Sequence, residues 1–318
     1  MKLVVLIPAF NEEESIADVI KQIPKRIPGV ESVKILVVND GSTDSTAEVS
    51  RKAGAAVVSH RSNKGVGAAF TTGVDAALER GADIIVNVDA DGQFNPRDIP
   101  ALVKPILDNR ADMVTCSRFL DKNLEPDMPW VKKFGNGFFT RLVNFCTGQR
   151  FTDTQCGFRA YSREAALRLT LFGQFTYTQE SFLDLVNKGL RVVEVPLRVR
   201  GERAYGKSKV VSNVFSYGLR ALTIIVRSAR DYQPLKFFGS AALFLISVGT
   251  IIGLALFIRL LLIHQVSPYM YAVYLALVFV IVGFLLLVLA LIADMSDRQR
   301  RLNEEILYRL KKKQLEGG

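Results

Sequence analysis

The sequence predicts an α/β fold in which a mostly parallel, Rossmann-like sheet carries flanking helices and is followed by membrane helices. Two observations lead to this prediction. Short apolar, β-rich runs alternate with helix-like stretches from the N-terminus, and two long runs near the C-terminus contain no charged residue. Strand–helix alternation at this pitch is typical of a parallel sheet wrapped by helices. Ligands of such sheets bind beyond the carboxyl ends of the strands, so polar residues there become site candidates.

The strands are short apolar runs, predicted at Leu3–Ile7, Val33–Val38, Ala56–Ser59, Ile84–Val88, Met113–Ser117 and Val192–Val199. The helices are predicted at Glu13–Ile23, Ser45–Ala53, Gly67–Arg80, Pro96–Asn109 and Lys133–Cys146. The second helix begins with a Ser-x-x-Glu pattern, which predicts a capping box at Ser45. Phe151–Tyr161 is a polar stretch and is assigned to no strand.

Two membrane-spanning helices are predicted, because Phe237–Ile258 and Ser267–Ala293 are uncharged and each reaches the ~20 residues that a span needs. Lys and Arg precede the first run and follow the second, whereas the connecting His264–Ser267 has neither; Arg259, near the far end of the first span, is the exception and is interpreted as a residue that reaches the interface. This bias places both termini and the catalytic part on the cytoplasmic side of the cell membrane. The expected organisation is a cytosolic catalytic domain at 1–209, an interfacial amphipathic helix at 210–234, a transmembrane hairpin at 235–293 and a basic cytosolic tail at 294–318.

The net charge of +10 is concentrated beside the apolar helices. This placement favours anionic lipid as the partner and argues against nucleic acid. The tail is compatible with a short coiled coil or a membrane-surface helix, so association of copies through the tail or the transmembrane helices stays open. The three cysteines lack metal-site spacing, and we expect them to be reduced and structural.

Acidic residues follow the first two strands, in Pro8-Ala9-Phe10-Asn11-Glu12 and Asn39-Asp40-Gly41-Ser42. A dinucleotide-binding Rossmann site would instead place glycines after the first strand. Because these glycines are missing, a dehydrogenase is disfavoured. The acids could accept hydrogen bonds from a nucleoside base and ribose, although Asp40 alone could also serve only to form the turn.

Two further acids, Asp89 and Asp91, follow the fourth strand one residue apart. If extended geometry persists, their side chains point to the same side. Hard oxygen ligands so placed suit Mg²⁺ or Mn²⁺ together with substrate phosphates. The metal would act as a Lewis acid on a departing nucleoside diphosphate.

A cationic loop lies between the last strand and the predicted interfacial helix, and it includes Arg203 and Lys209. Guanidinium and ammonium groups are natural partners of phosphate oxygens. A loop in this position could meet a phosphate headgroup that projects from the bilayer, or it could be a solvated basic face beside anionic lipid. Arg118, directly after the fifth strand, is a further phosphate-binding candidate.

Six stretches in this order resemble the family 2 glycosyltransferases with a GT-A fold: Pro8–Glu13, Val38–Asp44, Asp89–Gln93, Ser117–Phe119, Gln155–Tyr161 and Arg203–Lys209. Within that family they resemble the polyprenyl-phosphate glycosyltransferases, such as dolichol-phosphate mannose synthase and dolichyl-phosphate glucosyltransferase. Phe10 stands where many relatives have tyrosine. The resemblance implies a donor such as GDP-mannose or UDP-glucose and a dolichyl or undecaprenyl phosphate acceptor.

The resemblance also implies roles for individual residues. Nucleoside binding is implied for Pro8, Phe10, Glu12, Asp40 and Asp89; metal binding for Asp89, Asp91 and Gln93; and phosphate or acceptor binding for Arg118, Arg203 and Lys209. The candidate catalytic residues are Asp91, Arg118, Arg203 and Lys209.

A lipid phosphate has a second pKa near ~6, so at neutral pH it is an anionic nucleophile that needs no general base. Direct displacement would invert the anomeric centre. Two alternatives are kept: a processive polysaccharide synthase, and a transferase with a hydroxyl acceptor, for which Asp153 could be the base. A membrane scaffold with a decayed site is a third, non-enzymatic reading. The resemblance argues against the synthase, because the only tryptophan, Trp130, lacks the Gln-x-x-Arg-Trp signature.

Overall fold

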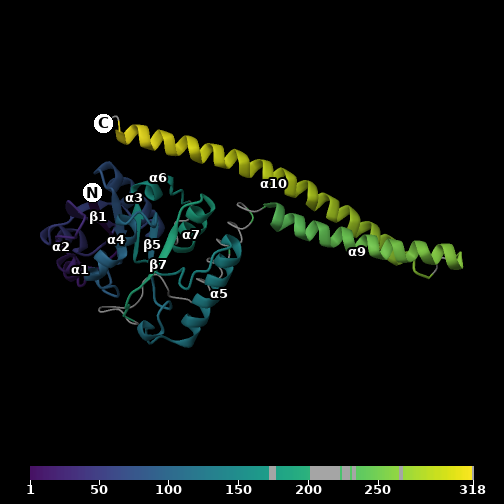
Figure 1. Ribbon diagram of the computed structural model, residues 1–318, viewed down its shortest axis with the longest axis horizontal. Coiled ribbons are helices and arrows are strands. Elements are labelled where there is room, and N and C mark those ends of the chain that lie inside the picture. Colours follow the sequence, from purple (N-terminus) through teal and green to yellow (C-terminus); the bar gives the residue numbers. More distant parts are fainter. Residues whose placement is uncertain (172–176, 201–222, 224–229, 231–233, 265–267, 317–318) are drawn as a thin grey trace. The chain divides into compact units, whose positions relative to one another are not determined.

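The computed structural model describes residues 1–171, 177–200, 223, 230, 234–264 and 268–316. The chain divides into two compact units, Met1–Ile225 with Ile306–Gly318, and Val226–Glu305. Figure 1 shows the strands and shorter helices of the first unit and the two long helices of the second. The predicted interfacial helix at 210–234, and with it Arg203 and Lys209, lies almost wholly outside the described residues.

The first unit is built on a seven-stranded sheet of order β3-β2-β1-β4-β6-β5-β7. Its strands are β1 (Lys2–Ala9), β2 (Ser32–Asn39), β3 (Ala56–Ser59), β4 (Ile84–Asn87), β5 (Met113–Ser117), β6 (Arg159–Ser162) and β7 (Val192–Pro196). Only β6 runs antiparallel to its neighbours, β4 and β5. The predicted mostly parallel sheet is therefore confirmed. The assignment of Phe151–Tyr161 to no strand is wrong in part, because Arg159–Tyr161 belong to β6.

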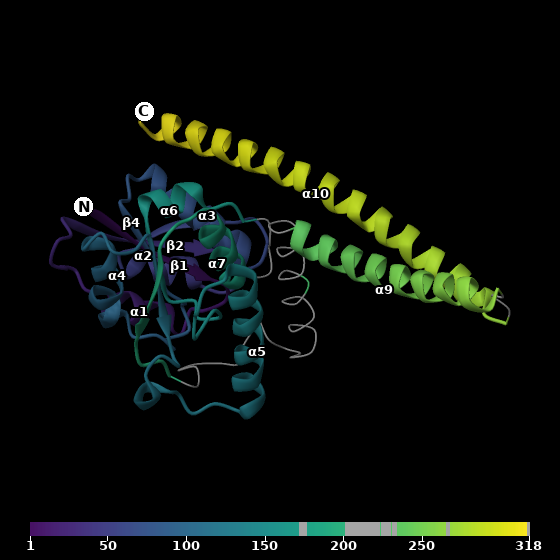
Figure 2. The same cartoon turned by 45° about the vertical axis from the view of Figure 1, so that its right-hand side comes forward.

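The helices that connect the strands are α1 (Ile16–Gln22), α2 (Thr46–Lys52), α3 (Val66–Glu79), η1 (Pro96–Asp98), α4 (Ile99–Leu107), η2 (Lys122–Leu124), α5 (Trp130–Thr147), α6 (Arg163–Arg168) and α7 (Thr178–Asn187). Figure 2 shows α5 running along one side of this unit. The capping box predicted at Ser45 is wrong, because the Ser45 side chain makes no capping bond. The Thr46 N–H donates instead to Asp44 Oδ1 at 3.0 Å.

The core follows from the alternation of side chains along each strand. Leu3, Val5 and Ile7 of β1 belong to one buried apolar cluster with Ile16 and Val19 of α1, and α4 adds Leu102 and Val103. Residues of the opposite parity on β1 face α3. Both faces of the central strands are covered, which explains why these strands read as continuous apolar runs.

The second unit contains α9 (Pro234–Ile263) and the part of α10 (Met270–Glu316) that ends at Glu305; the mean hydropathies of the two helices reach 2.6 and 3.4. Both helices are long and apolar enough to cross a membrane. They pack closely through small residues, since a Cβ added at Gly249 would lie 2.8 Å from the Ala276 carbonyl oxygen. The predicted tail at 294–318 does not begin a new element, because α10 continues through it to Glu316.

Candidate active site

The loops after β1, β2 and β4 meet at one edge of the sheet. The parallel register pairs Ala9 with Asn39, the last residues of β1 and β2, and pairs Leu6 with Asn87 at the end of β4. Asp40 therefore follows its strand beside the loop that carries Glu12. The strand ends that carry these acids therefore lie at one edge of the sheet, and their sharing of one site stays a prediction.

The β1 and β2 loops are joined by direct hydrogen bonds. Asn11, which adopts a left-handed backbone conformation with φ of 53°, accepts a hydrogen bond at Oδ1 from the Thr43 N–H at 2.8 Å. The Glu12 N–H donates to Thr46 Oγ1 at 2.8 Å, and Ser15 Oγ donates to Glu12 Oε2 at 3.1 Å. These bonds fix the chain that directly follows Phe10, which is half-buried, while Pro8 is buried within β1.

Asp40 is buried, with 3% of its surface exposed, and its carboxylate organises the loop after β3. Its Oδ1 lies 2.6 Å from His60 Nδ1 and accepts from the Lys64 N–H at 2.9 Å, while Oδ2 accepts from the Gly65 N–H at 2.8 Å. Beyond turn formation, Asp40 thus holds the loop that passes over Gly41. A Cβ at Gly41 would lie 2.4 Å from the Ser62 carbonyl carbon, so only glycine fits.

His60 was not among the residues predicted for the site. It directly follows β3, which pairs in parallel with β2 so that Ser59 lies opposite Asn39. Its second ring nitrogen, Nε2, lies 3.0 Å from Thr72 Oγ1. The sequence signal that could have found it is its position, since it follows a strand in the same way as Asp40.

The second pair of acids lies in a turn. β4 ends at Asn87, so Asp89 and Asp91 fall beyond the strand, and extended geometry does not persist to Asp91. Asp91 is buried, and its Oδ1 accepts from the Gln93 N–H at 3.0 Å. The turn, and not strand alternation, therefore determines how these acids are presented.

Gly157 provides the space in which the Asp89 carboxylate lies. A Cβ at this position would be 2.9 Å from Asp89 Oδ2 and 3.0 Å from the Tyr177 hydroxyl oxygen. Asn87 Nδ2 donates to the Tyr177 hydroxyl at 2.6 Å and to the Gly157 carbonyl at 2.9 Å. Burial, and next the neighbouring charge of Asp89, raises the pKa of Tyr177 well above its usual range. Tyr177 stacks on Phe70, with ring centroids 4.1 Å apart, so its side chain is held in place beside Asp89.

Arg118 follows β5 and is held by Asp153. Its Nε lies 2.6 Å from Asp153 Oδ2 and its Nη2 lies 2.9 Å from Oδ1, a bidentate pair in which the Asp153 side chain is fully buried. Burial lowers and the Asp153 charge raises the pKa of Arg118, with the net shift upward. Because the pair is neutral overall, Arg118 can offer a phosphate its remaining N–H groups but little net charge.

A carboxylate on β7 holds the loop that contains Asp153. Glu194 of β7 accepts from the backbone N–H groups of Thr152 and Asp153, both at 2.8 Å. Burial raises the pKa of this carboxyl, and these hydrogen bonds oppose the shift. Neither this support nor the Arg118–Asp153 pair was predicted, because their partners lie far apart in sequence.

Residues 4–170 match the family described as glycosyl transferase family 2. The chain therefore belongs to this family and is a glycosyltransferase, as its motifs had indicated. It is 32% identical over 219 residues to a polyprenol monophosphomannose synthase of Mycolicibacterium smegmatis, which covers 66% of this chain and 81% of that protein. It is 30% identical to a UDP-N-acetylglucosamine–dolichyl-phosphate N-acetylglucosaminyltransferase of Methanococcus voltae, over 61% of this chain and 83% of that protein.

Among solved structures, the chain is similar to glucosyl-3-phosphoglycerate synthase of Mycobacterium tuberculosis in complex with Mn²⁺, UDP-glucose and phosphoglyceric acid. The TM-score is 0.56 at 23% identity, and the match covers 72% of this chain and 79% of that one. This likeness confirms the predicted GT-A-type fold of the first unit.

Proposed function

We propose that this enzyme transfers a hexosyl group from a nucleotide-diphosphate sugar to a polyprenyl phosphate at the cytoplasmic membrane face. The observation that carries the proposal is that one family 2 glycosyltransferase chain combines an acid-lined sheet edge with two helices of membrane-spanning length. The names of its relatives from Mycolicibacterium smegmatis and Methanococcus voltae support a polyprenyl or dolichyl phosphate as the acceptor.

The residues at the β4 turn fit a divalent cation. Asp89 and Asp91 supply hard carboxylate oxygens, and Gln93 adds an amide oxygen on the same loop. In the part of the chain that the structure describes, no group of three or more His, Cys, Asp or Glu side chains could hold a metal. This donor set suits Mg²⁺ or Mn²⁺, which binds through one or two carboxylates with substrate phosphates completing the shell. When bound, the cation would stabilise charge on the departing nucleoside diphosphate.

The donor nucleoside would lie over the β1 and β2 loops, where Pro8, Phe10 and Glu12 flank the strand end. Asp40 would act there chiefly through the loop that it holds, because three hydrogen bonds already engage its carboxylate. Its Oδ2 accepts one of these bonds and retains a lone pair for a base N–H.

The acceptor side favours a phosphate over a hydroxyl. A hydroxyl acceptor needs a general base, and Asp153, the candidate for it, is fully buried and engaged by Arg118. A phosphate monoester is already anionic at neutral pH. The chain's own contribution would then be to orient it, with Arg203 and Lys209 meeting phosphate oxygens and Arg118 donating N–H groups. In-line displacement would invert the anomeric centre.

Helix α5 supports approach of the catalytic unit to a bilayer. Large aromatic side chains recur along it and are exposed: Trp130 by 76%, Phe134 by 67%, Phe138 by 44% and Phe145 by 86%. The helix carries Lys and Arg but no acidic residue. Exposed aromatic side chains on a basic helix are typical of contact with the membrane interface.

The proposal is tested with the full-length protein in detergent, a labelled nucleotide-sugar panel that includes GDP-mannose and UDP-glucose, and two acceptors of equal chain length, polyprenyl phosphate and polyprenol. We expect metal-dependent transfer to the phosphate and none to the alcohol. Equal or faster transfer to polyprenol would refute the phosphate nucleophile. Formation of long sugar polymers without a lipid acceptor would indicate the processive synthase instead.

A further inference from the structure

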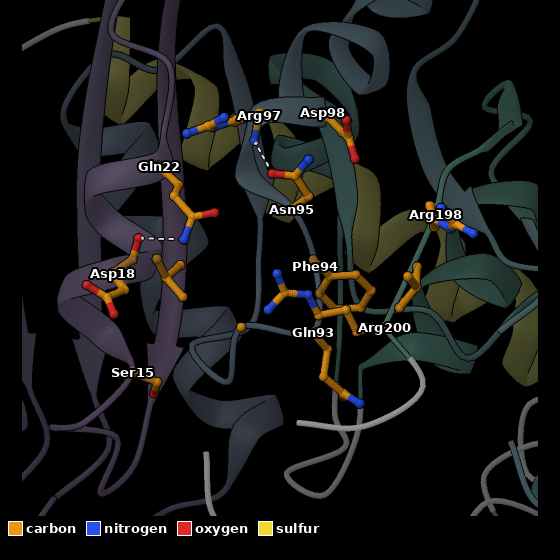
Figure 3. A pocket seen from close by; sticks show the side chains of 13 residues that line it. Ser15, Asp18, Gln22, Gln93, Phe94, Asn95, Arg97, Asp98, Arg198 and Arg200 are labelled. Carbon is orange, nitrogen blue, oxygen red and sulfur yellow. Dashed lines mark hydrogen bonds between the residues drawn. The ribbon is translucent and has the colours of Figure 1, made fainter. Parts of the chain in front are cut away.

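A cavity of about 570 Å³ lies between α1, the loop that follows Asp91 and the segment after β7. Figure 3 shows this cavity with Gln93 at one end and Asp98 at the other. Its volume is within the range of small-molecule sites. It lies beside the α1 flank of the sheet and borders the proposed metal loop through Gln93 and the β1 loop through Ser15, but Pro8, Phe10, Glu12 and Asp40 do not line it.

The walls of the cavity carry arginines that lack acidic partners. Arg97 and Arg200 are exposed, and across the residues that the structure describes neither forms an ion pair. In Figure 3 both guanidinium groups extend toward α1, and Arg198 lies at the far edge of the cavity. Two acidic residues line the cavity, Asp18 and Asp98. Asp18 Oδ1 lies 3.9 Å from Lys21 Nζ. Three arginines and two aspartates thus line the cavity.

The remaining lining can hold a carbon skeleton. Phe94 is only 8% exposed, and Val199 is also buried, so both can contribute an apolar surface to the cavity wall. Gln22 Nε2 donates to the Asp18 carbonyl at 3.0 Å, which leaves its Oε1 to accept a hydrogen bond from a ligand. A site with a cationic side, an apolar wall and an amide acceptor suits a small organic phosphate.

We propose that this cavity binds a phosphate monoester, with Arg97 and Arg200 pairing with its phosphate oxygens. Guanidinium groups recognise phosphate oxygens in two-pronged geometry, and here Arg97 of η1 and Arg200 of the segment after β7 both extend toward α1 across the cavity. The ligand is either a soluble phosphorylated compound or the headgroup of a phosphatidate-like lipid, since both present the same dianion.

The cavity is linked to the proposed donor site through the backbone. The Arg200 N–H donates to the Gln93 carbonyl at 3.0 Å, and the Gln93 N–H donates to Asp91 Oδ1 at 3.0 Å. A ligand that fixes Arg200 would therefore alter the presentation of Asp91. By linkage, the phosphate and the nucleotide should change each other's affinity by the same factor.

The binding test uses the full-length protein in detergent with chelator and no nucleotide-sugar, titrated with inorganic phosphate by calorimetry. Arg97→Gln and Arg200→Gln should each weaken binding by about tenfold to a hundredfold, because each removes charged hydrogen bonds. The matched control is Arg110→Gln, an exposed arginine that pairs with Asp108 away from the cavity. Phosphate can also bind the proposed acceptor residues, so the Arg203→Ala, Lys209→Ala double variant is titrated in parallel and should retain the binding event that Arg97→Gln and Arg200→Gln weaken.

The source of the phosphate is distinguished by flotation with phosphatidylcholine vesicles with and without phosphatidic acid. Calorimetric binding that is lost in Arg97→Gln supports a soluble ligand. Phosphatidate-dependent flotation lost in the same variant, without calorimetric binding, supports a lipid headgroup. The proposal is overturned if Arg97→Gln and Arg200→Gln equal the wild type in both assays, or if the Arg203→Ala, Lys209→Ala variant abolishes the binding. None of these outcomes depends on sugar transfer.

Discussion

The close contact between Gly157 and Asp89 gives a prediction whose size follows from the structure. In Gly157→Ala the added Cβ would lie 2.9 Å from Asp89 Oδ2, whereas ordinary contact begins at 3.4 Å, so the carboxylate must withdraw by about 0.5 Å. The Tyr177 hydroxyl, 3.0 Å from the same Cβ, cannot readily move because its ring is buried and stacked on Phe70. The displacement therefore falls on the proposed metal ligand.

We expect kcat/KM for the nucleotide-sugar to fall by about tenfold to a hundredfold in Gly157→Ala, since a displacement near ~1 Å can cost ~10²-fold. The concentration of Mn²⁺ needed for half-maximal rate should rise in parallel. Both are measured by initial rates over a metal titration. The matched control is Gly135→Ala, because a Cβ there meets nothing within 4 Å. A folded Gly157→Ala enzyme with unchanged kcat/KM and metal requirement would refute the placement of Asp89 in the metal site.

Three further predictions concern other parts of the site. Asp40→Ala should raise the KM for the nucleotide-sugar more than it lowers kcat, because it releases the loop at Lys64 and Gly65; calorimetry showing unchanged nucleotide affinity would exclude Asp40. Asp153→Ala leaves the Arg118 charge without its partner and should lower the free energy of unfolding, measured in urea, by about 3–5 kcal/mol. The control Asp108→Ala, at an exposed pair, should lower it by about 0.5 kcal/mol or less, and equal losses would contradict the pair. Burial raises the pKa of Glu194, so the native state holds this proton longer than the unfolded state. The stability of the wild type should therefore fall relative to Glu194→Gln as the pH rises above 4.5, and parallel curves would contradict the shift.

The parallel part of the sheet could be predicted from the sequence because local pattern and burial agree there. Each of β1 to β5 is an apolar run flanked by polar residues, and two of the six predicted strands, Ala56–Ser59 and Met113–Ser117, match in full. β6 could not be predicted, because it begins with a fully buried charge. Arg159 donates to the carbonyls of Thr154 and Thr178, partners that no local pattern reveals.

The site divides in a similar way. Acids at strand ends could be predicted, since a parallel sheet brings these ends to one edge. The partners that set their geometry could not: Gly157 and Tyr177 reach Asp89 from segments far along the chain, and Asp153 reaches Arg118 from 35 residues away. Sequence reasoning thus predicts which groups lie at this edge of the sheet but not what fixes their positions.

The measurement that tests the central claim most directly is the initial rate of sugar transfer to polyprenyl phosphate by wild type and Asp91→Asn, each first in chelator and then with Mg²⁺ or Mn²⁺ restored. We expect the wild type to be inactive in chelator and to recover fully with metal. Asp91→Asn should remain at least about 10²-fold slower under both conditions, because an amide cannot replace the charge that faces the cation. Transfer by Asp91→Asn at the wild-type rate after metal is restored would contradict the claim that this turn carries the reaction.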